Sequence, residues 1–211
     1  MSDESAVWHP STLSPALLQT LAALDKASLL LRFYLGGGTG LALQLGHRRS
    51  QDFDFFSFDS FDSESLLLRL ERLGDLSVTA RSAQTLHVEF RRAKVSFLGY
   101  AYRLLFPPQL FQGVQVADGR DIACMKIGAI AGRGAKRDFV DLYAASRRYG
   151  LAHLMELFQK KFSEANYSGV HLLKSLTYFE DAEKDPAPDM LIAASWEEIK
   201  KFFLREVPPL L

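Results

Sequence analysis

The feature that most constrains this chain is a glycine-rich turn followed closely by two spaced aspartates. The turn is Gly36-Gly37-Gly38, and the aspartates are Asp52 and Asp54. The thirteen residues from Thr39 to Gln51 suffice for one short helix that returns the chain to a neighbouring strand. This spacing predicts that the turn and both carboxylates lie at the same end of a sheet.

The two aspartates alternate with aromatic residues in the segment DFDFFSF, residues 52–58. Alternate side chains of a strand share a face, so Asp52 and Asp54 project together while Phe53 and Phe55 enter the core. Two such carboxylates can bind a hard divalent cation, for which Mg²⁺ is the natural match. The alternative is a solvent-facing strand that carries two ordinary charges.

The glycine turn fits neither of two well-known phosphate-binding motifs. Residues 36–42 contain neither G-x-G-x-x-G nor G-x-x-x-x-G-K-[ST]. A glycine turn before a helix nevertheless exposes backbone N–H groups, and a helix N-terminus favours a phosphate anion. A plain strand-to-helix turn is the alternative.

Hydrophobic periodicity predicts an α+β fold, with a sheet first and helices afterwards. The first part has a helix after the Ser14 cap, strands at 33–35 and 52–58, a helix from residue 62 or 63 to Gly74, and a hairpin of 85–90 against 94–100. After Pro107-Pro108 we expect helices at 121–131, 136–149, 151–162, 169–181 and 196–206, with a loop at 184–189. The predicted domains are an α+β domain at 1–110 and a helical domain at 111–211.

Composition excludes several functional classes. The 25 Lys and Arg residues balance 25 Asp and Glu residues, so no global field attracts nucleic acid or membrane, although a local basic patch remains open. Cys124 is the only cysteine, which excludes a disulfide framework and favours a small core residue in a reducing compartment. The start MSDESAVWHP lacks the features of a secretory signal, and no stretch is long enough for a membrane span. We therefore expect a cytoplasmic protein without membrane contact.

The segment GGTGLALQLGHRRSQDFDFF resembles the DNA polymerase beta-like nucleotidyltransferases, and within them the AbiEii/AbiGii abortive-infection toxin family. That superfamily places a Gly-Gly or Gly-Ser turn at this distance before Asp-x-Asp. The family also carries a helix with a lone lysine and a K-x-D-x-x-D-L-Y stretch, matched by Lys126 and by KRDFVDLY, residues 136–143. The resemblance spans about residues 33–146.

The resemblance implies a polymerase beta-like nucleotidyltransferase core, a small mixed sheet with flanking helices, followed by a C-terminal helical bundle. It implies that Asp52 and Asp54 bind one or two Mg²⁺ ions and take part in catalysis. The residues that it assigns to the nucleotide are Gly37, Gly38, Thr39, Arg48, Ser50, Lys126, Lys136 and Asp138.

Lys126 is the one charged residue between Ile122 and Ala131, on a helix otherwise suited to burial. It can extend to solvent, or reach a triphosphate as a point charge; the resemblance favours the phosphate role and a catalytic contribution. Asp141 can form an ordinary surface pair with Arg137, whereas the resemblance gives it the role of orienting a neighbour. The basic residues 47–49 can contact a triphosphate or RNA, or form a solvated loop.

One departure from the superfamily concerns the third carboxylate, expected on a neighbouring strand. The corresponding segment KVSFLGY holds Ser96, which puts catalysis in question because a third ligand helps to hold the metal. If Arg92 and Ala93 form the hairpin tip, Glu89 pairs with Ser96 and can substitute as a catalytic carboxylate. A one-residue shift in register would turn Glu89 away.

The sequence thus predicts a Mg²⁺-dependent nucleotidyltransferase that transfers a nucleoside monophosphate from a nucleoside triphosphate to a hydroxyl. The resemblance implies an RNA acceptor such as tRNA, or a protein hydroxyl, and a toxin with a cognate antitoxin. Two alternatives follow from Ser96: a nucleotide-binding protein with weakened turnover, or an interaction module that keeps only the fold.

Overall fold

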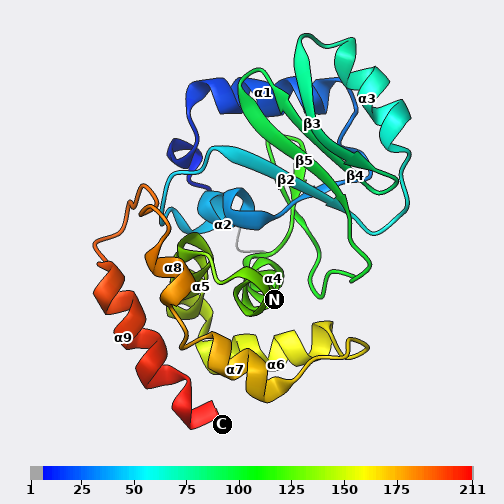
Figure 1. Cartoon of the computed structure of the whole chain (residues 1–211). Helices are drawn as coiled ribbons and strands as arrows, with labels where there is room; N and C mark the ends of the chain where they lie inside the picture. The colour runs from blue at the N-terminus through cyan, green and yellow to red at the C-terminus, as the bar shows by residue number, and fades with distance from the viewer. Residues whose placement is uncertain (1–6, 211) are drawn as a thin grey trace.

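The chain folds into a mixed sheet with helices on both faces (Figure 1). The computed structural model describes residues 7–210. Helices α1 (Pro15–Lys26) and α3 (Ser63–Glu71) cover one face, and α2 (Gly37–Leu45) and α4 (Gly119–Arg133) lie on the other. The remaining helices pack around and beyond α4, away from the sheet (Figure 1). The predicted α+β class is confirmed.

Within residues 7–210, seven strands form one sheet in the order β3-β4-β5-β2-β1-β7-β6. Strand β2 is antiparallel to β1 and parallel to β5, and β7 is parallel to β1. The bounds are Tyr34–Leu35 (β1), Asp52–Ser57 (β2), Leu76–Ser82 (β3), Thr85–Phe90 (β4), Ala93–Gly99 (β5), Gln109–Phe111 (β6) and Val114–Val116 (β7).

Helices α5, α6 and α9 begin and end at or close to the predicted positions. Gly150 ends α5 with a positive φ of 83°, as its lack of a Cβ allows. Predicted caps are also present, because the Ser14 hydroxyl accepts from Leu17 N–H and the Asp62 carboxylate from Glu64 N–H. The bounds are Lys136–Tyr149 (α5), Leu151–Lys161 (α6), Gly169–Ser175 (α7), Glu180–Glu183 (α8) and Trp196–Glu206 (α9), with 3-10 helices at Pro10–Thr12 and Pro208–Leu210.

The alternation in β2 places its aromatic residues where the sequence predicts them. Phe53 and Phe55 are fully buried in the core between the sheet and helices α1 and α3. Asp52 and Asp54 are half-buried on the opposite face. The core therefore fixes the direction in which the two carboxylates project.

The sheet is larger than predicted. Strand β3 was missed because it lies at an edge and is exposed along almost its whole length, so it lacks an alternating pattern. The β6–β7 hairpin was also missed, and β7 pairs with β1 through Leu35 and Val116. The predicted domain boundary after residue 110 falls inside β6, whereas the last strand of the sheet ends at Val116.

The predicted helix at 169–181 is broken into α7 and α8. Leu176 and Ala182 are both fully buried in the same core. Residues six apart lie on different faces of a continuous α-helix, so the break lets both side chains reach that core.

The β4–β5 hairpin turns one residue earlier than predicted. Its tip is Arg91-Arg92, both with positive φ (50° and 64°), and Phe90 pairs with Ala93. The predicted register is therefore wrong: Glu89 pairs with Lys94, and His87 pairs with Ser96.

The opening residues 1–6, where we predicted no secretory signal, lie outside the described residues, as does Leu211. Cys124 is fully buried and free, as predicted. Within residues 7–210, no helix has the length and apolar character needed to cross a membrane.

The hairpin tip generates a stability prediction. Two-residue loops with positive φ at both positions favour Asn-Gly, whereas an arginine in the left-handed region is strained by roughly 1 kcal/mol. We expect the double change Arg91→Asn and Arg92→Gly to raise the free energy of unfolding by roughly 1 kcal/mol. Urea unfolding followed by circular dichroism measures this; a lower midpoint than in the unchanged protein would contradict the assigned turn.

Candidate active site

The glycine turn and the two aspartates meet, as the spacing predicts. Leu35 pairs with Phe55 across β1 and β2, and Gly36 N–H donates to the Asp54 carbonyl over 2.9 Å. Helix α2 starts directly after this contact, at Gly37. The N-terminus of α2 and the carboxylates of β2 therefore lie at one end of the sheet.

Two glycines of this turn are required by close contacts. Gly37 has a φ of +57°, and a Cβ there would lie 2.6 Å from Asp54 Oδ2. At Gly38 a Cβ would overlap Arg48 Nη2, so only glycine lets the guanidinium pass the start of the helix. The first N–H groups of an α-helix have no intrahelical partners, so those of α2 are available beside Asp54.

A cavity of about 670 Å³ opens over this end of the sheet. It contains Asp52 and Asp54 together with several cations, and the segment 186–189 forms part of its wall. The lining residues are Gly38, Thr39, Arg48, Arg49, Ser50, Gln51, Asp52, Asp54, His87, Lys94, Ser96, Lys126, Arg133, Arg137, Pro186, Ala187, Pro188 and Asp189.

Asp141 of α5 is the centre of a buried ion network behind this cavity. The Arg48 guanidinium donates to it twice, from Nε over 2.6 Å and from Nη2 over 3.0 Å. His47 Nε2 lies 2.7 Å and Lys126 Nζ 2.6 Å from its oxygens. Burial by itself would raise the pKa of Asp141, but Lys126 and Arg48 hold that pKa well below its usual range.

Asp138, one turn earlier on α5, holds a second pair of cations. Lys126 Nζ lies 2.8 Å from Asp138 Oδ1, and Arg133 Nε lies 2.8 Å from Oδ2. Against the effect of burial, Lys126 and Arg133 lower the pKa of Asp138. Three permanent cations, Arg48, Lys126 and Arg133, thus share two buried carboxylates, which leaves net positive charge at the cavity wall.

These contacts separate the alternatives left open by the sequence. Lys126 does not extend to bulk solvent; it is buried, bound by two carboxylates and part of the cavity lining. Asp141 does not form a surface pair with Arg137 but orients Arg48 and Lys126.

Thr39 and Ser50 connect the start of α2 to the start of β2. Their hydroxyl oxygens lie 2.6 Å apart, and the Thr39 hydroxyl also donates to the Asp52 carbonyl. Both residues line the cavity, but their hydroxyls are engaged within the protein. This arrangement fixes Asp52 relative to the glycine turn.

The neighbouring strand β5 places Ser96 directly beside Asp54. His87 of β4 comes next, with Nδ1 2.9 Å from Ser96 Oγ, and it lines the cavity. Glu89 is exposed, pairs with Lys94 and does not line the cavity. Ser96 thus occupies the expected third position, and the earlier turn places Glu89 in line with Lys94 and Asp52 instead of Ser96 and Asp54, outside the cavity lining.

Lys136 does not face the cavity as the resemblance implied. Its Nζ donates to the Asp185 carbonyl over 2.6 Å, and its backbone N–H donates to the Asp185 carboxylate over 2.9 Å. The chain then continues as the wall segment 186–189, and Arg49 N–H donates to the Asp189 carbonyl over 2.8 Å. Sequence reasoning missed this wall because its contacts join residues far apart in the chain.

The donor set at Asp52 and Asp54 fits Mg²⁺ bound together with a substrate. Within residues 7–210, no three His, Cys, Asp or Glu side chains form a group that could hold a metal alone. Mg²⁺ is commonly held by one or two carboxylates plus substrate phosphates and water. Two carboxylates beside a phosphate-favouring helix end meet that requirement.

Comparison with known proteins gives a consistent result. A family model described as "Nucleotidyl transferase AbiEii toxin, Type IV TA system" matches residues 19–210. The uncharacterized protein aq_aa25 of Aquifex aeolicus (strain VF5) is 42% identical over 181 residues, which cover 83% of this chain and 86% of that protein.

Solved structures share the fold at low sequence identity. The nucleotidyltransferase toxin MenT4 of Mycobacterium tuberculosis H37Rv superposes with a TM-score of 0.55 at 20% identity, covering 92% of this chain and 84% of MenT4. JHP933 from Helicobacter pylori superposes with a TM-score of 0.53 at 17% identity, covering 94% and 93%. The predicted nucleotidyltransferase fold is confirmed.

The ion network generates a second stability prediction. Replacing Asp141 by Asn leaves Lys126 and Arg48 buried without full compensation, so we expect a loss of about 3 to 5 kcal/mol in the free energy of unfolding. Asp189→Asn, which breaks only the exposed pair with Arg49, should change it by less than about 0.5 kcal/mol. Urea unfolding of both variants measures the difference, and equal effects would contradict the importance of the buried network.

A pH dependence follows from the lowered pKa values of Asp138 and Asp141. Below about pH 4 the unfolded chain binds protons that the folded protein does not, because an unfolded aspartate has a pKa of about 3.9. The stabilisation is therefore complete above this pH and is lost as pH falls through the folded pKa values. We expect the unfolding free energy to fall by up to about 1.4 kcal/mol per pH unit for each group. Urea unfolding across this range measures the slope, which Asp141→Asn should reduce.

Proposed function

Because this chain belongs to the AbiEii nucleotidyltransferase toxin family, we propose that it transfers a nucleoside monophosphate from a nucleoside triphosphate to an acceptor hydroxyl, with Mg²⁺ bound at Asp52 and Asp54. The observation that carries this proposal is the convergence of three features in one cavity. These are the N-terminus of α2, the carboxylates of β2 and the cations held by Asp138 and Asp141.

The triphosphate would lie between the start of α2 and the cation cluster. N–H groups of Gly37, Gly38 and Thr39 would donate to phosphate oxygens, as helix N-termini do in other phosphate sites. Lys126 and Arg133 would neutralise charge on the leaving pyrophosphate. Both cations are already oriented by Asp138, so little reorganisation would be needed when substrate binds.

Asp52 and Asp54 would hold the metal from the same face of β2. Mg²⁺ bound there would supply charge stabilisation for the phosphoryl group during transfer. The role of the protein would be to keep both carboxylates fixed, through the buried Phe53 and Phe55 on the other face and through Thr39 at the Asp52 carbonyl.

The acceptor would be a hydroxyl of RNA, such as the end of a tRNA, or of a protein. Its oxygen would form a bond to the α-phosphorus while the bond to the β-phosphate oxygen breaks, releasing a proton and pyrophosphate. We propose a cytoplasmic toxin, neutralised by a cognate antitoxin. An antitoxin-like gene directly upstream would support that biological role.

A second candidate is a nucleotide-binding protein with weakened turnover. Ser96 carries this alternative, because it lies beside Asp54 at the position where a third carboxylate would complete the metal site. An interaction module that keeps only the fold is the third candidate. Nucleotide binding distinguishes the second candidate from the third, because only a nucleotide-binding protein needs the cation cluster to bind phosphate.

The proposal predicts label transfer from an α-labelled triphosphate to bulk RNA, with release of pyrophosphate, in the presence of Mg²⁺. The double change Asp52→Asn and Asp54→Asn should reduce transfer by at least a hundredfold while the protein stays folded, because it removes both metal ligands. The matched control is Asp59→Asn with Asp75→Asn, two exposed aspartates outside the cavity.

Calorimetry with Mg-nucleotide completes this experiment. Absence of transfer and pyrophosphate with every triphosphate would reject the enzyme and leave the binder if heat of binding is seen. Absence of binding as well would leave the interaction module. Transfer that survives in the Asp52 and Asp54 variant would place the chemistry elsewhere.

A further inference from the structure

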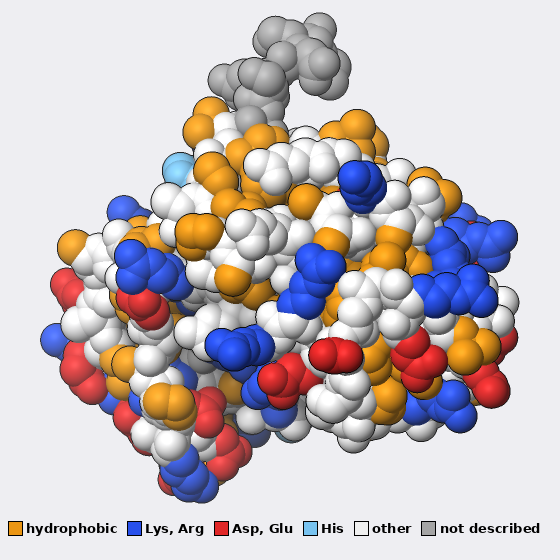
Figure 2. Space-filling view, turned by 90° about the horizontal axis from the view of Figure 1, so that it is seen from above, with side chains coloured by type: hydrophobic (Ala, Val, Ile, Leu, Met, Phe, Trp, Pro, Cys, Tyr) orange, Lys and Arg blue, Asp and Glu red, His pale blue; other side chains and the backbone are white. Residues whose placement is uncertain are grey.

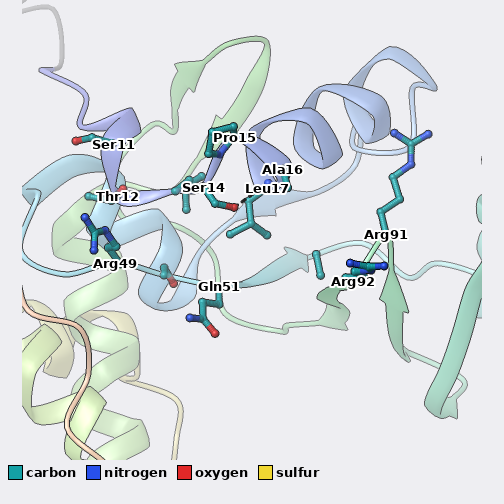
Figure 3. A pocket seen from close by; sticks show the side chains of 13 residues that line it. Ser11, Thr12, Ser14, Pro15, Ala16, Leu17, Arg49, Gln51, Arg91 and Arg92 are labelled. Atoms are coloured by element: carbon teal, nitrogen blue, oxygen red, sulfur yellow. Dashed lines mark hydrogen bonds between the residues drawn. The ribbon is translucent and has the colours of Figure 1, made fainter.

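A second cavity, of about 590 Å³, lies between the start of α1 and the tip of the β4–β5 hairpin. Figure 3 shows Arg49 and Gln51 on one side of it, Arg91 and Arg92 on the other, and residues 11–17 along its upper edge. Among residues 7–210, three arginines line this cavity, and no aspartate or glutamate does. The cavity therefore favours a ligand with negative charge.

This cavity adjoins the proposed active site. Arg49, Ser50 and Gln51 line both cavities. They directly precede Asp52 at the start of β2. A chain-like ligand whose end lies at Asp52 and Asp54 can therefore extend past Arg49 toward the hairpin tip.

The local charge contrasts with the rest of the molecule. The chain as a whole has no net charge, and Figure 2 shows acidic and basic side chains mixed over the face that it draws. Within residues 7–210, neither Arg91 nor Arg92 forms an ion pair with a carboxylate. Arg91 Nη2 does donate to the Leu73 carbonyl over 3.3 Å, a long and exposed hydrogen bond that a phosphate oxygen can replace. Arg49 pairs with Asp189, but both side chains are more than half exposed, so a phosphate can replace that partner at little cost.

The backbone at the hairpin tip does not favour arginine. Both Arg91 and Arg92 have positive φ, the conformation for which asparagine and glycine are preferred in a two-residue loop. The turn geometry therefore gives no reason for two adjacent arginines. Arg91 donates from Nη2 to the Leu73 carbonyl over 3.3 Å and lies over the Phe90 ring, whereas the placement at the edge of the cavity is what accounts for Arg92.

The nature of the lining indicates what part of an anionic ligand is bound. In the described part of the chain no aromatic side chain lines the cavity, so these residues provide no platform of the kind on which unpaired bases usually stack. Arginine, serine and glutamine side chains instead suit phosphate oxygens. Helix α1 has no acidic residue in its first turn, so its N-terminus adds to this preference.

We infer that this cavity binds the phosphate backbone of a nucleic-acid acceptor, with Arg49, Arg91 and Arg92 contacting phosphates upstream of the reacting hydroxyl. The inference rests on the proposed function, and it commits to RNA rather than protein as the acceptor. The backbone contacts would bind RNA largely without regard to sequence, and the active site would select the reacting end.

The test is binding of a fluorescein-labelled single-stranded RNA, followed by anisotropy over a range of salt concentrations. The variant is Arg91→Asn with Arg92→Gly, which removes two charges and supplies the residues that the turn prefers. The matched control is Arg147→Gln with Arg148→Gln, two adjacent exposed arginines on α5 that line neither cavity. Urea unfolding confirms that each variant is folded.

We expect the hairpin variant to bind RNA roughly tenfold more weakly, and the control to bind as the unchanged protein does. The negative slope of log affinity against log salt concentration should become shallower by about 1.4, because each lost single-strand phosphate contact contributes about 0.7 to its magnitude. Equal affinity and slope in the hairpin variant would overturn the inference, as would an equal loss in the control.

Two further measurements separate this inference from the proposed function. Calorimetry with Mg-nucleotide should be unchanged in the hairpin variant, because Arg91 and Arg92 do not line the active-site cavity. If the hairpin variant transfers label to RNA normally and binds RNA as the unchanged protein does, the arginine site is rejected and the proposed function is not. If a poly-glutamate peptide loses affinity in the hairpin variant while RNA does not, the site binds an acidic protein and the inference is wrong.

Discussion

The arrangement of the candidate site depends on one buried carboxylate, Asp141. It lies on α5, yet its partners come from the segment between α2 and β2 and from α4. It thereby ties the segment that carries the glycine turn and the aspartates to the helical half of the molecule. Burying such charges costs free energy that their mutual attraction only partly returns. Asp141 is therefore better understood as setting the position of Arg48 and Lys126 than as a source of net stability.

The same contacts prepare the cavity for an anion. Asp138 and Asp141 hold Lys126 and Arg133 in place before any ligand arrives, and Gly38 leaves room for the Arg48 guanidinium to cross the start of α2. The cations that position the elements are thus the ones that line the cavity. Because two carboxylates share three permanent cations, the wall keeps positive charge while each buried cation has a partner.

The parts of the site that could be predicted from sequence are local. Alternation in residues 52–57 fixes the faces of Asp52 and Phe53. The number of residues between Gly38 and Asp52 leaves room for only one short helix before the chain returns to a neighbouring strand. The hairpin register could not be predicted, because a tip shifted by one residue changes every pair, and Glu89 was misplaced for that reason. Lys136 was misassigned because its partner, Asp185, is 49 residues away. The arginine-lined cavity also arises from three separated segments.

Fold and chemistry depend on different residues in this molecule. Ser96 and the two aspartates are on the half-buried face of the sheet, whereas Phe53, Phe55 and Phe97 fill the core on the other. A carboxylate can therefore be lost beside Asp54 without a cavity in the core or a change in fold. The cations cannot be lost so freely, because Arg48 and Lys126 are bound to buried carboxylates that would remain uncompensated. The positive charge of the cavity thus follows from groups that the fold itself requires, while the proposed turnover depends on groups that it does not.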